Sequence, residues 1–365
     1  MRSRESTLSE SEVSLLCNAA STCFTVKACS GNVAVVVPKP GWVECFDRMI
    51  SELEERGFQA KLVERAGSLF LVFFRIRRGW RPYTYLLAFL VTLVTVLIAG
   101  FDVARAFATI ANRGNLPLLA FTFLAGLLGP LVAHESGHLA AARRGRIPVS
   151  PPLFLPAPPP SLGGIGTFGA LINMRGLARD RESLALLGLM GPLTGFLAAL
   201  PLAWIGLRVS LLLPARALGN AASVGFAPLV MLLLASAVGG SSGYAIVLHP
   251  LALASFIVFV VTFLNLLPIG QLDGAHVVYA IFGERVHAVA GYATLVISML
   301  AAILAPSLSV VAVFSLLAYI INAVLARGRH PGVLNPYKPM PAWKAGLVAA
   351  GYFLLLVLTV PVPVG

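Results

Sequence analysis

The residues His134 to His138 read His-Glu-Ser-Gly-His and form an HExxH pattern. Two histidines four residues apart lie on one face of a helix, where their imidazoles can share a metal ion. A divalent cation lowers the pKa of a water molecule bound to it toward ~7, and a neighbouring carboxylate can then accept the proton. The pattern predicts hydrolysis by metal-activated water, with His134 and His138 as metal ligands and Glu135 as general base.

A catalytic zinc ion usually has three protein ligands and one open position, so a third ligand is expected on another helix. The chain contains four aspartates, and Asp273 is the one expected at the depth of the histidines. The other three fall in polar stretches or at the far end of the first apolar run: Asp47, Asp102 and Asp180. His276, three residues after Asp273, is the alternative ligand. Alternatively, His276 contacts a metal-ligand side chain without binding the metal itself, or it only packs at the cytoplasmic surface.

The elements that must position these residues are membrane-spanning helices. The chain is 58% hydrophobic and 12% charged, with a mean hydropathy of +0.87, which is far from the composition of a soluble domain. The HExxH pattern lies within the apolar run 116–142. An ionisable residue near the bilayer centre costs at least ~2.5 kcal/mol, so three adjacent ones indicate a strong partner such as a metal ion.

About seven apolar runs are long enough to cross a bilayer. They are 82–100, 116–142, 183–207, 250–268, 286–305, 308–326 and 342–361. Residues 221–239 are also apolar but are broken by Gly225 and Pro228. We expect that segment to stay at the outer face, because an additional crossing would put Asp273 and His134 on opposite sides of the membrane.

The net charge of +12 indicates membrane orientation rather than nucleic-acid binding. Lys and Arg gather in short stretches beside apolar runs, at 75–78, 143–146 and 327–330, instead of forming one basic face. This is the pattern of cytoplasmic loops. We therefore expect a multi-pass protein of the cell membrane with a cytoplasmic N-terminus, with the lipid bilayer as a partner and without nucleic acid. His249, His287 and His330 lie near the ends of apolar runs and are expected to be solvated or interfacial.

The first 79 residues are expected to form a cytoplasmic α+β domain, and residues 80–365 the transmembrane domain. Strand-like runs at 33–37, 58–63 and 69–74 flank an amphipathic segment at 42–56, which predicts a βαββ arrangement. The N-terminal domain lacks a recognisable catalytic cluster, so a regulatory or substrate-docking role is expected. Its cysteines, Cys17, Cys23, Cys29 and Cys45, are expected to be reduced thiols in that compartment.

Several short motifs of the chain resemble those of the site-2 protease family of intramembrane zinc metalloproteases. The matching residues are His134–His138, the turn Gly191-Pro192-Leu193, the glycine-rich stretch 163–166, and Asn265, Pro268, Asp273 and Gly274. The resemblance covers about residues 116–283 and is closest to the archaeal and chloroplast-type branch that lacks a PDZ domain.

The resemblance implies one zinc ion held by His134, His138 and Asp273, with Glu135 as base and Asn265 as a stabiliser of the oxyanion. A side-chain amide beside the metal can donate to developing negative charge. An alternative role for Asn265 is to satisfy backbone groups left open near Pro268.

Residues 148–173 are rich in proline and glycine and cannot form a regular span. We expect a re-entrant loop or hairpin, whose exposed edge near 166–171 could hold a substrate in extended form. An ordinary connecting loop is the alternative. The leading hypothesis is an endopeptidase that cleaves transmembrane segments of other proteins near the cytoplasmic face. The second is a metal transporter or sensor, for which internal repeats and a polar path through both leaflets would be expected.

Overall fold

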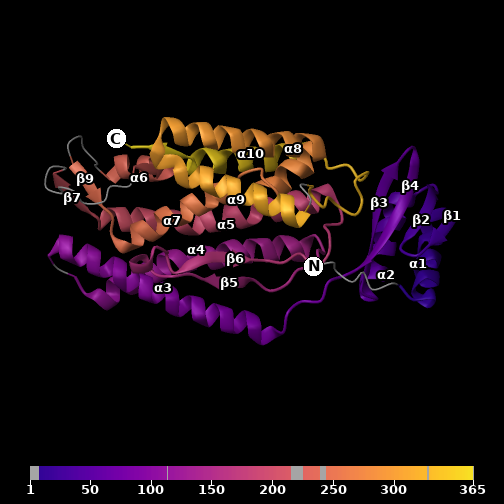
Figure 1. Cartoon of the computed structure of the whole chain (residues 1–365), viewed down its shortest axis with the longest axis horizontal. Helices are drawn as coiled ribbons and strands as arrows, with labels where there is room; N and C mark the ends of the chain where they lie inside the picture. The colour runs from indigo at the N-terminus through magenta and orange to yellow at the C-terminus, as the bar shows by residue number, and fades with distance from the viewer. Residues whose placement is uncertain (1–7, 113, 215–224, 239–243, 327–328, 365) are drawn as a thin grey trace.

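The structure is a computed structural model that describes residues 8–112, 114–214, 225–238, 244–326 and 329–364. An N-terminal α+β region lies at one end of a group of long helices (Figure 1). The chain is a polytopic helical protein with a small N-terminal sheet region, as the composition predicts.

The N-terminal region contains two helices and a four-stranded antiparallel sheet of order β1-β2-β4-β3. The elements are α1 (Glu10–Cys23), β1 (Phe24–Ser30), β2 (Val33–Pro38), α2 (Trp42–Glu55), β3 (Phe58–Arg65) and β4 (Ser68–Arg75). The sequence predicts α2, β2, β3 and β4 but omits α1 and β1. Strand β1 carries Lys27 and Thr25 on a largely exposed surface, so it lacks the apolar run by which the other strands are recognised.

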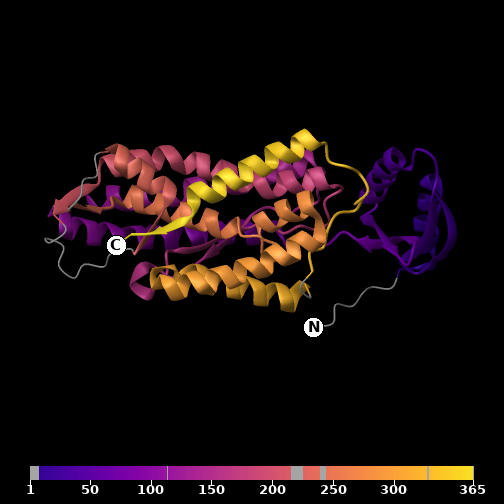
Figure 2. The ribbon, with the colours of Figure 1, turned by 90° about the horizontal axis from the view of Figure 1, so that it is seen from above.

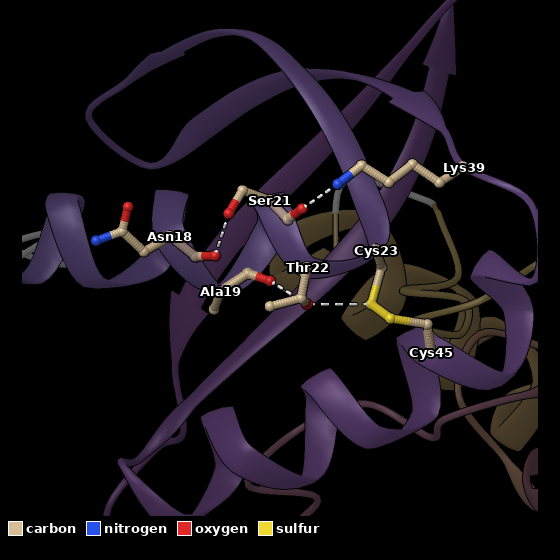
Figure 3. The surroundings of a disulfide bond; sticks show 7 residues. All are labelled: Asn18, Ala19, Ser21, Thr22, Cys23, Lys39 and Cys45. Carbon is tan, nitrogen blue, oxygen red and sulfur yellow. Dashed lines mark hydrogen bonds between the residues drawn. A yellow bond between two sulfur atoms is a disulfide. The ribbon is translucent and has the colours of Figure 1, made fainter.

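The four cysteines are paired as Cys17–Cys29 and Cys23–Cys45, so the expectation of reduced thiols is wrong. Their Cα atoms lie 6.2 and 5.5 Å apart. Cys23 ends α1 and leads directly into β1, while α2 packs beside α1 and brings Cys45 to it. Figure 3 shows the Cys23–Cys45 bond at the last turn of α1, where Lys39 donates a hydrogen bond to the Ser21 carbonyl at 2.5 Å.

Within the described residues, six helices are long and apolar enough to cross a membrane. The helices beyond the N-terminal region are α3 (Pro82–Ala111), α4 (Leu116–Arg144), α5 (Arg181–Arg208), α6 (Leu229–Val238), α7 (Pro250–Asn265), α8 (Asp273–Leu304), α9 (Ser309–Ala326) and α10 (Ala342–Thr359). Helix α7 has 16 residues, which is about 24 Å at 1.5 Å per residue and slightly short of a hydrocarbon core.

Helix α8 is interrupted at Gly283, whose φ of 85° and ψ of −179° are not helical. The chain reverses there. The ring centroids of Tyr279 and His287, on opposite sides of the break, lie 6.2 Å apart, and a Cβ at Gly291 would meet the Pro268 carbonyl at 2.9 Å. The arm that starts at Asp273 therefore ends at this reversal, and the arm after Gly283 runs back past Pro268 and corresponds to the predicted span 286–305.

Residues 148–173 contain the predicted hairpin. Strands β5 (Leu153–Pro156) and β6 (Thr167–Leu171) pair antiparallel, with a short 3-10 turn, Pro160–Leu162, between them. The hairpin lies between α3 and α4 (Figure 1). Thr95 of α3 fixes it by donating a hydrogen bond to the Gly166 carbonyl at 2.7 Å.

The described part of the ambiguous segment 221–239 contains β8 (Phe226–Pro228) and the ten-residue helix α6. Residues 221–224 and 239 lie outside the described residues. At about 15 Å, α6 is too short to cross the bilayer. Strand β8 pairs with β10 (Pro361–Pro363) at the end of the molecule opposite the N-terminal region (Figure 2). Strands β7 (Leu211–Pro214) and β9 (Tyr244–Val247) form a second small sheet at that end (Figure 1).

Candidate metal centre

Helix α4 carries the HExxH residues on a buried face. It begins after Asn115, whose side chain accepts a hydrogen bond from the Leu118 amide at 3.1 Å. It ends at two arginines followed by Gly145. Basic residues in the last turn suit the negative end of the helix dipole. His134, Glu135 and His138 are all buried, as the i and i+4 spacing predicts.

Asp273, the first residue of α8, meets the two histidines. Its carboxylate oxygens lie 3.3 Å from His134 Nε2 and 3.4 Å from His138 Nε2, and the two Nε2 atoms are 3.0 Å apart. Ligand atoms bound at about 2.0–2.1 Å to a tetrahedral ion are about 3.3 Å from one another. The three donor atoms therefore fit one metal ion.

The protonation of His138 also suits metal binding. Its Nδ1 lies 2.8 Å from the carbonyl oxygen of Leu187, which can only accept a hydrogen bond. In the neutral ring the proton is therefore on Nδ1, which leaves the lone pair of Nε2 facing Asp273 and His134.

Glycines of α5 allow the ligands to come together, and the sequence interpretation did not assign them this role. A Cβ at Gly191 would lie 2.1 Å from His138 Nε2, and one at Gly188 would lie 2.5 Å from the Asp273 carbonyl. A Cβ at Gly195 would likewise lie 3.0 Å from the Cβ of His134. Gly191 and Pro192 lie inside α5 rather than in a turn. The spacing of glycines on one helix face was the available signal.

Glu135 and Asn265 face the same small cavity, of about 150 Å³, as the metal-ligand side chains. The Oε2 atom of Glu135 is buried and has no hydrogen-bond partner among the described residues. Asn265, the last residue of α7, also makes no side-chain hydrogen bond within the described chain. Both side chains therefore line the cavity beside the metal-ligand side chains.

His276 lines the cavity but is not among the three clustered donors. Its Nδ1 lies 2.8 Å from His330 Nε2, and the His330 ring stacks on Tyr279 with centroids 4.3 Å apart. His287 and His330 are both buried, so the expectation that they are solvated or interfacial is wrong. The reversal at Gly283 and the return of the chain after α9 enclose these rings, and neither feature is visible in local hydropathy.

Comparisons with known proteins agree with this geometry. Residues 122–306, just over half of the chain, match peptidase family M50. The chain is 28% identical over 244 residues to "Probable zinc metalloprotease EGY1, chloroplastic" of Arabidopsis thaliana, covering 65% of this chain and 42% of that protein. It is 28% identical over 211 residues to "Probable zinc metalloprotease EGY2, chloroplastic" of Oryza sativa subsp. indica, covering 52% and 36%.

The chain thus spans less than half the length of these relatives. No solved structure matches it. The family match covers the HExxH helix, the hairpin, α5, α7 and the arm that carries Asp273. On the extent of this match, the chain belongs to peptidase family M50.

Proposed function

We propose that this chain is an intramembrane zinc metalloendopeptidase that cleaves transmembrane segments of other membrane proteins. The observation that carries the proposal is the group of three donor atoms from His134, His138 and Asp273 beside the unpartnered carboxylate oxygen of Glu135. The group lies within helices that are apolar enough to cross a bilayer. Two imidazoles and a carboxylate are a ligand set that suits zinc.

When bound, zinc would supply Lewis-acid polarisation of the scissile carbonyl and activation of water. Glu135 accepts the proton of the attacking water and later delivers it to the leaving amine. The Asn265 amide donates a hydrogen bond to the oxygen that becomes negatively charged as the carbonyl is attacked. His138 is kept in the required tautomer by the Leu187 carbonyl.

We infer that strand β6 holds the substrate. It pairs with β5 along one edge, and no other described strand pairs with it. Ala170 and Leu171 of β6 line the cavity with the metal-ligand side chains. A substrate segment unwound from its helix can pair with the free edge of β6 and present an extended peptide bond to Glu135.

We further infer that the protein lies in the cell membrane, with residues 1–79 as a cytoplasmic regulatory or substrate-docking domain and residues 80–365 as the protease domain. The short basic stretches at 75–78 and 143–146 support this orientation, whereas the two disulfides of the N-terminal region are of a kind more common outside the cytoplasm. The proposed orientation places cleavage near the cytoplasmic face. Accessibility of Lys27 to an impermeant amine reagent in intact cells tests it, because a cytoplasmic lysine is labelled only after the membrane is opened.

Glu135→Gln tests the chemistry. The variant is expected to keep bound zinc, because Glu135 is not among the clustered donors, and to lose about 10²–10⁴-fold in cleavage of a reconstituted membrane substrate. The matched control is Glu55→Gln, which changes an exposed residue of α2. Removal of zinc by a chelator should abolish cleavage, and added zinc should restore it. Full activity of Glu135→Gln would exclude the proposed base, and zinc flux in proteoliposomes unaffected by this substitution would support a transporter instead.

A further inference from the structure

A second cavity, of about 320 Å³, adjoins the metal-ligand cavity. His134 and Asn265 line both cavities, so the two spaces meet at the proposed reaction centre. The second cavity is bounded by α4, α7, Gly195 of α5 and the β5–β6 hairpin. It is larger than the metal-ligand cavity, and the proposed chemistry does not use it.

The walls of this second cavity are apolar. Leu131 contributes from α4, Ile257, Val258 and Val261 from α7, and Phe168 from the hairpin. The two threonines in the wall are already satisfied. Thr262 Oγ1 donates to the Val258 carbonyl at 2.8 Å, and Thr167 Oγ1 donates to the Leu155 carbonyl at 2.9 Å. A polar ligand group would lose its hydrogen bonds to water and find few partners there, whereas an apolar group has no hydrogen bond to lose.

The position of the cavity along β6 relates it to the substrate. Residues 170–172 line the metal-ligand cavity, and residues 167–169 line the apolar one. Consecutive residues of a strand are about 3.3 Å apart. An extended segment paired with β6 therefore passes from one cavity to the other within about two residues of the bond that faces Glu135.

We propose that this apolar cavity is a substrate-specificity pocket for one large aliphatic or aromatic side chain, located within about two residues of the scissile bond. The inference rests on the proposed protease function. Burial of such a side chain is worth a factor of about 10–100 in kcat/KM relative to alanine, from the transfer free energy of a Leu or Phe side chain.

The test uses the zinc-loaded full chain in nanodiscs. Transmembrane peptides carrying Ala, Leu, Phe or Asp at each position around the cleavage site report kcat/KM. Amino-acid hydroxamates with Ala, Leu or Phe side chains report binding without cleavage. Val261→Phe fills the pocket and Ile257→Ala enlarges it. The matched control is Val313→Phe, at a position of α9 that is 57% exposed.

The wild type and the control should favour Leu or Phe over Ala at one position by about tenfold or more, in both kcat/KM and hydroxamate Kd. Val261→Phe should lose this preference while it keeps its zinc and still cleaves the Ala peptide. Ile257→Ala should shift the preference from Leu toward Phe. If Val261→Phe does not fold, the presence or absence of this shift tests the pocket instead.

The absence of a size preference in the wild type would overturn the proposal, as would a preference that persists in a zinc-loaded Val261→Phe protein. A wild type that cleaves no peptide but binds the hydroxamates with a size preference lost in Val261→Phe would refute the protease function and leave the pocket supported. Cleavage by the wild type with no size preference in either assay would refute the specificity pocket and leave the protease function supported.

Discussion

The ring of His138 is held from two sides, by the Leu187 carbonyl at Nδ1 and by the backbone of α5 at Gly191. A methyl group at position 191 would occupy the space of the imidazole, since its carbon would lie 2.1 Å from Nε2. Interiors at this density cannot absorb such an overlap without moving a helix or a ring. The separation of donor atoms that suits a metal ion thus depends on the absence of a side chain on the neighbouring helix.

We therefore predict that Gly191→Ala lowers zinc affinity by about 100-fold, at the upper end of the loss produced when the groups that orient a metal ligand are disturbed. Zinc content after dialysis against a graded chelator series measures it. Gly129→Ala is the matched control, because a Cβ there meets no atom of the described residues within 4 Å and alanine favours the helix by about 1 kcal/mol. If Gly191→Ala kept wild-type zinc affinity, the close packing of α4 and α5 would not be what positions His138.

The sequence predicts this site unevenly at the scale of single residues. His134, Glu135 and His138 can be recognised because their spacing is local, and Asp273 because the chain has few aspartates. The glycines of α5 could not be assigned, because their role is a contact with another helix. Local sequence patterns identify the residues that can bind a metal, whereas the close approach of two helix backbones depends on tertiary packing.

One of the contacts between the β5–β6 hairpin and α3 is a hydrogen bond that a substitution can isolate. Thr95 Oγ1 donates to the Gly166 carbonyl at 2.7 Å, and Gly166 packs against the backbone of α3, with φ at +88°. Loss of that hydrogen bond costs about 0.5–1.5 kcal/mol and loosens the strand that is proposed to pair with the substrate.

Thr95→Val is expected to lower cleavage by about 2–10-fold and to speed amide exchange across residues 166–171, without changing zinc content. Thr109→Val provides the control, because the Thr109 hydroxyl donates to the Arg105 carbonyl of the same helix. Hydrogen-exchange mass spectrometry and a peptide-cleavage assay measure the two effects. Unchanged exchange at 166–171 in Thr95→Val would show that α3 does not hold the hairpin through this bond.

The cysteine pairs give a second prediction at the scale of elements. Cys17–Cys29 joins α1 to β1, and Cys23–Cys45 joins the end of α1 to α2, with sequence separations of 12 and 22. Closing loops of this size stabilises a fold by about 3 kcal/mol each in the chain-entropy account. Protein alkylated with maleimide at lysis and then denatured should carry no label before reduction and four after it. Four labels without reduction would contradict the pairing.

Element boundaries were predicted best where a long apolar run had a sharp end. The start of α3 at Pro82 and that of α10 at Ala342 agree with the predicted runs. The arm that begins at Asp273 was not predicted as a helix, because it is short and its direction changes at a single glycine. Helix α1 was missed because its buried residues, Leu16, Ala20 and Cys23, are too few to give a clear period.

Viewed as a whole molecule, the N-terminal region is fixed to the helices by two segments distant in sequence. Arg179 forms an ion pair with Glu54, and the Leu62 amide of β3 donates to the Leu334 carbonyl at 2.9 Å. The segment that contains Leu334 also carries His330, whose ring contacts His276 beside the metal-ligand cavity. A continuous path of contacts thus joins the N-terminal sheet to the arm that carries Asp273.

Lys338 is the charged centre of this contact. Its Nζ lies 2.8 Å from both Asp47 of α2 and Asp180 at the start of α5. Burial favours the neutral carboxyl of Asp180, but hydrogen bonds from Lys338 and Ser183 outweigh it and lower the pKa of Asp180 below its ordinary 3.8. Burial likewise opposes the charge on Lys338, yet the two carboxylates raise the pKa of this lysine above 10.5.

These directions fix the pH range of the contact. The contribution of Asp180 is present above its unfolded pKa and fades as the pH falls through its lowered folded pKa. The contribution of Lys338 is present below its unfolded pKa and fades as the pH rises through its raised folded pKa. Both groups are charged between pH 6 and 8, so the contact should not vary with pH over that range.

Lys338→Met is therefore expected to weaken the attachment of the N-terminal region by about 1–2 kcal/mol, because it leaves two neighbouring carboxylates without their shared cation. Exchange of the amides at residues 58–65 and 330–336 should speed by about 5–30-fold, equally at pH 6 and pH 8 after correction for intrinsic rates. Lys27→Met, on the exposed face of β1, is the control and should leave exchange in both segments unchanged. Equal exchange in Lys338→Met and the wild type would mean that Arg179, Leu62 and their partners hold the N-terminal region without this ion triplet.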